Sequence, residues 1–231
     1  MQEPSSIPII AIDGTTASGK GTTAYRLAQH FGFHYLNSGA LYRLVAHIAI
    51  KNRIALDDVE ELVLIASQLE VTFVEKKVIY KGEDIWHILR GEEQGKHASI
   101  VSRITPVRDA LLETQRTMAK SPGLVAEGRD MCTRVFAHAN VKIYLDADVT
   151  VRARRRLGDE VKDGHNASLE AMVQEIRERD HRDMNKDVGK LYPAPDAHII
   201  DNSLLAKEET LRECITYCEQ KGIRKATDLS L

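Results

Sequence analysis

Cysteine is scarce in this sequence, apolar stretches are short, and opposite charges nearly cancel. The three cysteines are odd in number and fit no disulfide framework, so we expect a reducing compartment. Lysine and arginine number 32 against 34 acidic residues, and the net charge of −2 argues against a broad surface for nucleic acid or an anionic membrane. No stretch approaches the ~18 apolar residues of a membrane span, and the first residues lack the features of a signal peptide. We therefore expect a cytoplasmic protein with small-molecule ligands.

The chain is long enough for one large domain. Its 231 residues, 43% of them hydrophobic, can build a single core, since one core stops growing near ~250 residues. Short apolar runs alternate with amphipathic helical stretches, a pattern typical of β-α-β units. We predict an α/β fold with a five-stranded parallel sheet flanked by helices. The expected strands are residues 7–12, 33–36, 124–126, 141–145 and 198–200.

Two segments interrupt this alternation. Between about residues 57 and 102 the chain offers a helix over 59–69 and two short apolar runs, 71–74 and 78–80, separated by charged residues. These predict a small hairpin within an insertion on the rim of the sheet. Residues 158–167 are polar, contain glycine and lie between two helices, so they predict a mobile loop.

The most specific motif follows the first expected strand. The pattern GxxxxGK lies between an apolar strand and an amphipathic helix, and the segment comprises Gly14, Thr15, Thr16, Ala17, Ser18, Gly19, Lys20, Gly21 and Thr22. Glycine lets the backbone curl so that amide groups point inward, and the helix N-terminus adds partial positive charge. Lys20 supplies a point charge for the β- and γ-phosphates. The motif predicts a nucleoside triphosphate site, with an ordinary glycine-rich turn as the alternative.

Charged residues continue the apolar stripe of the helix that begins near Ser168. Arg179, Asp183 and Lys186 keep the spacing of that stripe, with Arg182 alongside. Unpaired charge inside a protein is costly, so this pattern indicates a pocket for anionic phosphates. A structural ion-pair network, or a helix that leaves the core, is the alternative.

A second group of cations precedes the predicted loop. Arg152, Arg155 and Arg156 are spaced i, i+3, i+4, with Arg154 beside them. This arrangement suggests a lid that closes and delivers arginines to a transferring phosphoryl group. A solvated basic face, balanced by the acidic residues of the loop, is an equally good interpretation.

An acidic residue follows the strand at 124–126. Glu127 precedes Gly128, Arg129 and Asp130, and strands of an open α/β sheet point their carboxyl ends at the ligand crevice. Glu127 would hold Mg²⁺ directly or through water, although a simple turn is the alternative.

Together these residues resemble the nucleoside monophosphate kinases, and specifically the bacterial cytidylate (CMP) kinases. The resemblance covers nearly the whole chain. It rests on residues 12–14 leading into the GKGT loop, and on Leu36–Arg43, Glu127–Met131 and Glu178–Asp183. It implies one P-loop kinase domain over 1–231, with a core at about 1–56, 103–157 and 185–231, an NMP-binding insert at about 57–102 and a lid at about 158–184.

The resemblance also implies an activity. Such a kinase transfers a phosphoryl group from ATP directly to the phosphate of CMP or dCMP, in pyrimidine nucleotide metabolism. ATP itself would supply most of the ligands of Mg²⁺, with Thr22 and Glu127 as possible further ligands. Family members are often monomers, and no nucleic-acid or membrane partner is expected.

Functional residues follow from the same resemblance. Ser38 matches a residue on the CMP side, and Arg43 and Arg129 match phosphate-binding arginines. Arg179 and Asp183 match the pair that meets phosphate and pentose. The positions that match readers of the cytosine base are Ser99, Arg108 and Asp130. The residues expected to act in catalysis are Lys20, Arg129, Arg179, Arg155 and Arg156.

Two positions depart from the family pattern. Lys186 stands where the family often has arginine, which replaces a planar bidentate donor by a point charge. Cys132 stands where the family usually has glycine, so the backbone there is less permissive.

Two other functions stay open. One is a kinase on this scaffold with another acceptor (UMP/CMP, dCMP-preferring or non-nucleotide), and the other is a non-catalytic nucleotide-binding or RNA-interacting module.

Overall fold

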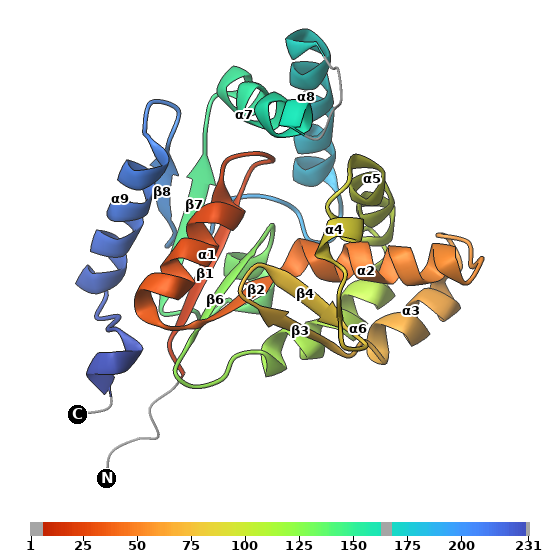
Figure 1. Ribbon diagram of the computed structural model, residues 1–231, viewed down its shortest axis with the longest axis horizontal. Coiled ribbons are helices and arrows are strands. Elements are labelled where there is room, and N and C mark those ends of the chain that lie inside the picture. Colours follow the sequence, from red (N-terminus) through yellow and green to blue (C-terminus); the bar gives the residue numbers. More distant parts are fainter. Residues whose placement is uncertain (1–6, 163–167, 230–231) are drawn as a thin grey trace.

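A parallel five-stranded sheet forms the centre of the molecule (Figure 1). The structure, a computed structural model, describes residues 7–162 and 168–229. The strand order is β2-β6-β1-β7-β8, and the predicted α/β fold is confirmed. All five expected strands are present, although the first begins two residues later than predicted. Their bounds are β1 Ile9–Gly14, β2 His34–Asn37, β6 Leu124–Gly128, β7 Val141–Asp146 and β8 His198–Asp201.

Helices cover both faces of this sheet because side chains alternate along each strand. Ile10 and Ile12 of β1 pack on one face with α1 (Lys20–Phe31) and α9 (Lys207–Gln220). Ala11 between them faces the other side, where α2 (Ser38–Lys51) and α6 (Thr105–Thr117) pack.

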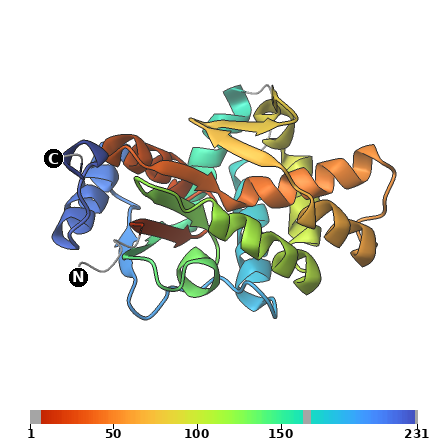
Figure 2. The same ribbon diagram turned by 90° about the horizontal axis from the view of Figure 1, so that it is seen from below.

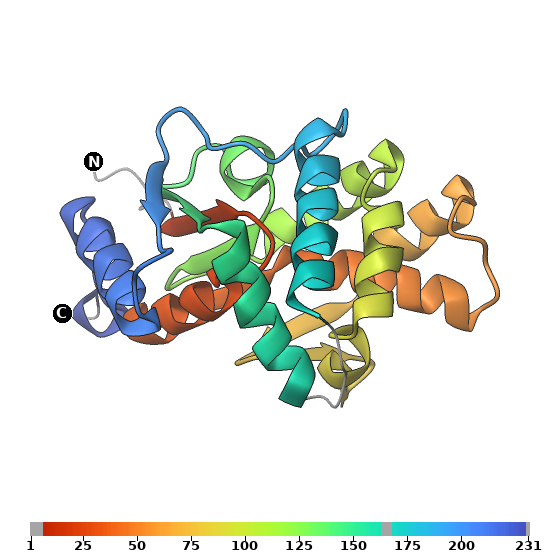
Figure 3. The ribbon, with the colours of Figure 1, turned by 90° about the horizontal axis from the view of Figure 1, so that it is seen from above.

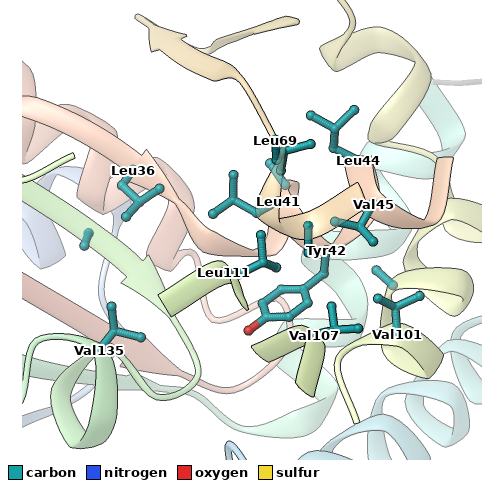
Figure 4. Close-up of a cluster of buried hydrophobic side chains, with 14 of the residues drawn as sticks. Leu36, Leu41, Tyr42, Leu44, Val45, Leu69, Val101, Val107, Leu111 and Val135 are labelled. Carbon is teal, nitrogen blue, oxygen red and sulfur yellow. The ribbon is translucent and has the colours of Figure 1, made fainter. Parts of the chain in front are cut away.

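The hydrophobic core on the Ala11 face joins the sheet to α2 and α6. Leu36 from β2, Leu41 and Tyr42 from α2, and Val107 and Leu111 from α6 meet in it (Figure 4). The side chain of Asn37 caps α2 by accepting a hydrogen bond from the amide of Ala40 at 3.1 Å. The start of α2 is therefore fixed at the carboxyl end of β2.

The predicted insertion folds as helices and a small antiparallel sheet. The predicted hairpin is confirmed, and a third short strand that the sequence pattern did not indicate pairs with it. The helix predicted over 59–69 ends at Ser67. The elements are α3 Val59–Ser67, β3 Val71–Val74, β4 Lys77–Tyr80, β5 Glu83–Asp84, α4 Trp86–Leu89 and α5 Glu92–Val101. α3 and α9 lie at opposite ends of the molecule (Figures 1 and 2).

Two helices, α7 (Val149–Lys162) and α8 (Leu169–Asn185), pack on each other above the carboxyl ends of the strands (Figure 1). The predicted loop at 158–167 is wrong for residues 158–162, which continue α7. A single glycine inside a helix costs only about 1 kcal/mol, so Gly158 does not end it. Residues 163–167 lie outside the described residues. Among the helices described, none is long and apolar enough to cross a membrane.

Candidate active site

A cavity of about 240 Å³ opens at the carboxyl ends of the central strands. Its lining includes more cationic side chains than carboxylates. The cations are Lys20, Arg43, Arg108, Arg129, Arg156, Arg179 and Lys186, and the carboxylates are Glu127, Asp130 and Asp183. Such an excess of positive charge in a concave site favours anionic ligands.

The loop between β1 and α1 borders this cavity. At Gly14 a side chain would collide with the backbone of β7, because a Cβ atom there would lie 2.1 Å from the carbonyl oxygen of Leu145. Gly19 precedes the helix in the left-handed region, with φ 89, which glycine adopts without strain. The loop therefore curls back on itself, and Lys20 Nζ donates a hydrogen bond to the Thr15 carbonyl at 3.1 Å.

Lys20 lies in a strongly electropositive environment. Burial and then the Arg129 guanidinium lower its pKa to about 7, against the opposing effect of Glu127. An anion bound beside the ammonium group would reverse this shift, since it favours the charged form. The loop is thus suited to a polyanion such as a triphosphate.

Arg43 and Arg179 belong to the same electropositive group. Arg43 on α2 donates hydrogen bonds to the carbonyls of Leu89 and Gly91, the latter at 2.8 Å, so the insert holds its guanidinium. Burial, followed by other arginines nearby, lowers the pKa of both guanidiniums to about 10. A phosphate group bound between such guanidiniums would offset their mutual repulsion.

Arg129 connects the loop to α8. Its Nε lies 2.8 Å from a carboxylate oxygen of Asp183, and its Nη2 donates to the Thr16 hydroxyl at 3.0 Å. Lys186 Nζ lies 3.5 Å from the other oxygen of Asp183. Although burial acts in the opposite direction, these two cations hold the pKa of Asp183 well below its usual range.

The far side of the cavity carries a buried ion pair. Arg108 on α6 pairs with Asp130, which follows β6, and donates to the Ser102 carbonyl at 2.9 Å. The Tyr42 ring packs 5.4 Å from the guanidinium carbon, and Ser99 lines the same wall. The pair offers donors and an acceptor side by side.

Most of the residues predicted from the sequence line this one cavity, and those that do not are Gly14, Thr15, Ser18, Gly19, Gly21, Thr22 and Arg155. It brings together every residue assigned to the acceptor, namely Ser38, Arg43, Ser99, Arg108, Arg129, Asp130, Arg179 and Asp183. Arg156 lines it too and lies 3.6 Å from Glu175. Arg182 does not face inward, since its side chain is 42% exposed and pairs with Glu178.

Arg155 and Thr22 line a second, smaller cavity of about 40 Å³ on the other side of the loop. Arg155 donates to the side-chain oxygen of Asn202 at 2.8 Å, and Asn202 in turn donates to the Ser18 carbonyl at 2.8 Å. Lys207 at the start of α9 completes this wall. The loop between β1 and α1 is thus flanked by two cavities.

Two buried charged residues bind the loop. Asp180 was not among the predicted site residues, and Arg152, expected among the arginines of a lid, does not line the main cavity. Arg152 on α7 pairs with Asp180 on α8 and donates to the Thr16 carbonyl at 3.0 Å. Both side chains are buried. Asp180 lies four positions after Ile176, which is in the apolar stripe, so its spacing was the signal that could have found it.

Glu127 is the described acidic group best placed for a metal ion at the loop. Its side chain lines the main cavity, and its Oε1 would lie 3.4 Å from a Cβ atom placed on Gly21. The described residues contain no group of three or more potential metal ligands. One carboxylate suits Mg²⁺ that keeps phosphate and water as its other ligands, whereas Thr22 does not line this cavity.

A triphosphate loop facing a cation-lined cavity, beneath two charged helices, defines a P-loop kinase whose acceptor is itself an anion. The family model for cytidylate kinase matches residues 10–220, so the chain belongs to the cytidylate kinase family. The resemblance stated from the sequence is confirmed.

Individual relatives agree with this assignment. Cytidylate kinase from Ralstonia nicotianae is 43% identical over 218 residues, which cover 94% of this chain and 95% of the relative. Cytidylate kinase from Bordetella bronchiseptica is 44% identical over 210 residues, covering 91% and 94%. A solved structure of an uncharacterized protein from Eubacterium ventriosum matches with a TM-score of 0.53 at 12% identity, over 92% of this chain and 98% of that one. This last likeness concerns the fold alone.

Proposed function

We propose that this protein transfers the γ-phosphoryl group of ATP to the phosphate of CMP and dCMP, forming CDP and dCDP. One observation carries the proposal: the loop lysine, Lys20, and the Arg108–Asp130 pair line the same cavity. A donor triphosphate and an acceptor base can therefore be held in one cavity.

The acceptor needs no general base. The second pKa of a phosphate monoester is near ~6, so CMP is mostly dianionic at pH 7 and already nucleophilic. The protein has to align two polyanions and neutralise their charge. Arg43, Arg129 and Arg179 would hold the acceptor phosphate, and Lys20 with the loop amides would hold ATP.

The base is recognised by complementary hydrogen bonding. Cytosine offers an amino donor at N4 next to acceptors at N3 and O2. The Asp130 carboxylate accepts from the amino group, while Arg108 donates to the ring acceptors and Ser99 adds a hydroxyl. Uracil has an oxygen in place of the amino group. That oxygen would face the Asp130 carboxylate with no hydrogen to donate. This pairing favours CMP over UMP.

Mg²⁺ would come with ATP, and Glu127 would hold it on the protein side. The ion would supply neutralisation of phosphate charge. The smaller cavity would take the base of ATP. Arg155, expected from the sequence to act in catalysis, lines this cavity and not the main one, so it would contact ATP rather than the transferring phosphoryl group. Residues 57–102 and the described parts of α7 and α8 beyond the Arg152–Asp180 contact with the loop would be the moving parts, closing over the cavity that Arg156 lines and excluding water. We expect the enzyme to act as a monomer in the cytoplasm.

The test is an ADP-release assay with Mg-ATP and CMP, dCMP, UMP, AMP or GMP offered separately. Fast turnover with CMP and dCMP and little with purine monophosphates is expected. Lys20→Ala should keep the fold and lower kcat/KM by roughly 10²–10³, as loss of one preorganised charge contact does. Purine preference would overturn the base assignments. Tight ATP binding without turnover on any monophosphate would overturn the proposed function.

A further inference from the structure

Gly189 lies against the guanidinium of Arg108. It belongs to the segment between α8 and β8, which runs from the end of α8 across to β8 (Figure 3), and its φ is 66. A Cβ atom on its backbone would lie 2.1 Å from Arg108 Nη2, 2.2 Å from Cζ and 2.7 Å from Nη1. A side chain at this position therefore requires Arg108 to move.

Arg108 has little freedom to move. Its side chain is only 2% exposed, and its two terminal nitrogens bind Asp130 and the Ser102 carbonyl. The Tyr42 ring packs against it. The Nε atom is buried and has no hydrogen-bond partner among the described residues. Displacement of the guanidinium would stretch or break the contact with Asp130, Ser102 or both.

The segment that carries Gly189 is itself fixed to the acceptor side of the site. Lys186, directly after α8, pairs with Asp183 at 3.5 Å. The amide of Leu191 donates to the carbonyl of Asp183 at 2.8 Å. Gly189 lies between these two anchors, so its backbone cannot recede freely from Arg108.

We propose that Gly189 is a positioning residue for base recognition, and this inference rests on the proposed function. The absence of a side chain lets the segment after α8 pack directly on Arg108, which fixes where the Arg108–Asp130 pair lies in the cavity. Gly189 is not among the residues that line the cavity, so it would act through Arg108 and not by direct contact with the substrate. A side chain there weakens the binding and selection of the acceptor and leaves the ATP side unchanged.

A matched control separates displacement of Arg108 from backbone strain. Alanine at φ 66 is strained whatever surrounds it. Gly222, after α9, has φ 85 with no atom within 4 Å of a Cβ position, so Gly222→Ala carries a similar strain far from Arg108. Asparagine tolerates the left-handed backbone better than alanine, so Gly189→Asn retains the collision with less strain.

The experiment measures KM for CMP, KM for ATP, the CMP-to-UMP ratio of kcat/KM and thermal unfolding for the wild type, Gly189→Ala, Gly189→Asn and Gly222→Ala. We expect KM for CMP to rise about tenfold in both Gly189 variants, as loss of one good polar contact does, with a smaller CMP-to-UMP ratio. KM for ATP should stay within about twofold of the wild-type value, a smaller change than the loss of one hydrogen bond would cause. Gly222→Ala should lower the melting temperature and leave every kinetic constant unchanged.

Two results would overturn the inference. One is an unchanged KM for CMP in the Gly189 variants, and the other is an equal loss for CMP and ATP. If Gly189→Ala does not fold, the same kinetic constants measured for Gly189→Asn test the inference. A wild-type enzyme that does not phosphorylate CMP overturns the proposed function, and the inference with it, and the wild-type measurement alone identifies that case.

Discussion

The carboxylate of Asp180 accepts a hydrogen bond from the backbone amide of Thr16 at 3.2 Å, although 164 positions separate the two residues. Asp180 also pairs with Arg152, whose guanidinium donates to the carbonyl of the same Thr16. Both backbone polar groups of Thr16, in the loop between β1 and α1, are thus held by α7 and α8. The two helices above the site are fixed to the loop through buried charge.

Replacement of Asp180 by alanine should be strongly destabilising. Arg152 would remain buried without its carboxylate, and breaking a buried ion pair typically costs about 3–5 kcal/mol. Urea denaturation measures the change. Glu178→Ala is the control on the same helix, because its pair with Arg182 is exposed and worth less than about 1 kcal/mol. Equal stability of the two variants would show that the Asp180 pair does not hold α8 to the loop.

Replacement of Asp130 by asparagine should relax base selection. The amide can turn either its oxygen or its nitrogen toward the base, so the carboxylate's preference for the cytosine amino group is lost. We expect kcat/KM for CMP to fall at least tenfold and the CMP-to-UMP ratio to approach one, as measured with both acceptors at saturating Mg-ATP.

Asp109→Asn is the matched control for this change. Asp109 lies on the same helix as Arg108 but its side chain is exposed and pairs with Arg134. Its CMP-to-UMP ratio should equal that of the wild type. An unchanged ratio in Asp130→Asn would mean that other groups read the base.

The sheet and the loop motif could be predicted because both depend on local sequence. Buried strands need short apolar runs, and a loop that wraps phosphate needs glycine at fixed positions. The end of α7 could not be found in this way, since Gly158 and the charged residues after it are compatible with either helix or loop. β5 consists of Glu83 and Asp84, two acidic residues that carry no strand signal.

The acceptor residues were found through the family resemblance, and spacing alone indicated only some of them. Arg179 and Asp183 continue an apolar stripe, so their inward direction was visible in the pattern. Arg108 lies on α6, four positions after Ile104 and three before Leu111, so its spacing indicates the inward face, but nothing local indicates that it pairs with Asp130. Its contact with Gly189 joins positions distant in the chain, and only the folded arrangement reveals it.

Cys132 fills a space in which the backbone needs no glycine. Its φ is not in the left-handed region, its amide donates to Asp13 at 2.8 Å, and its thiol donates to the Ala11 carbonyl at 3.4 Å. Burial raises the pKa of this thiol well above its usual range. Cys132→Gly should lower the unfolding free energy by about 1–2 kcal/mol through lost packing and added chain entropy, measured by urea denaturation.

The same variant should keep its catalytic constants. The described Cys132 side chain packs between β1 and β7 and does not line the main cavity. Cys132→Ala, which removes only the sulfur, should lie between glycine and the wild type in stability. A glycine variant as stable as the wild type would contradict a packing role.

Binding of ATP should depend on pH through Lys20. In the free protein its pKa is about 7, because burial and Arg129 disfavour the ammonium form. A bound triphosphate favours that form, so the pKa rises in the complex and binding takes up a proton when the pH exceeds about 7. Below that value Lys20 is already charged in the free protein, and this contribution to the pH dependence vanishes. Affinity should therefore fall as the pH rises from 7.5 to 9, by up to about tenfold per unit.

Calorimetric titration with Mg-ATP, without acceptor, measures this effect. At pH 7.5–9 the γ-phosphate, whose second pKa is near ~6, is already ionised, so its own titration contributes little. Two buffers of different ionisation enthalpy at each pH give the number of protons taken up. Lys20→Met should bind more weakly and take up none. Equal proton uptake by the wild type and Lys20→Met would assign the titration to another group and remove Lys20 from the pH dependence of binding.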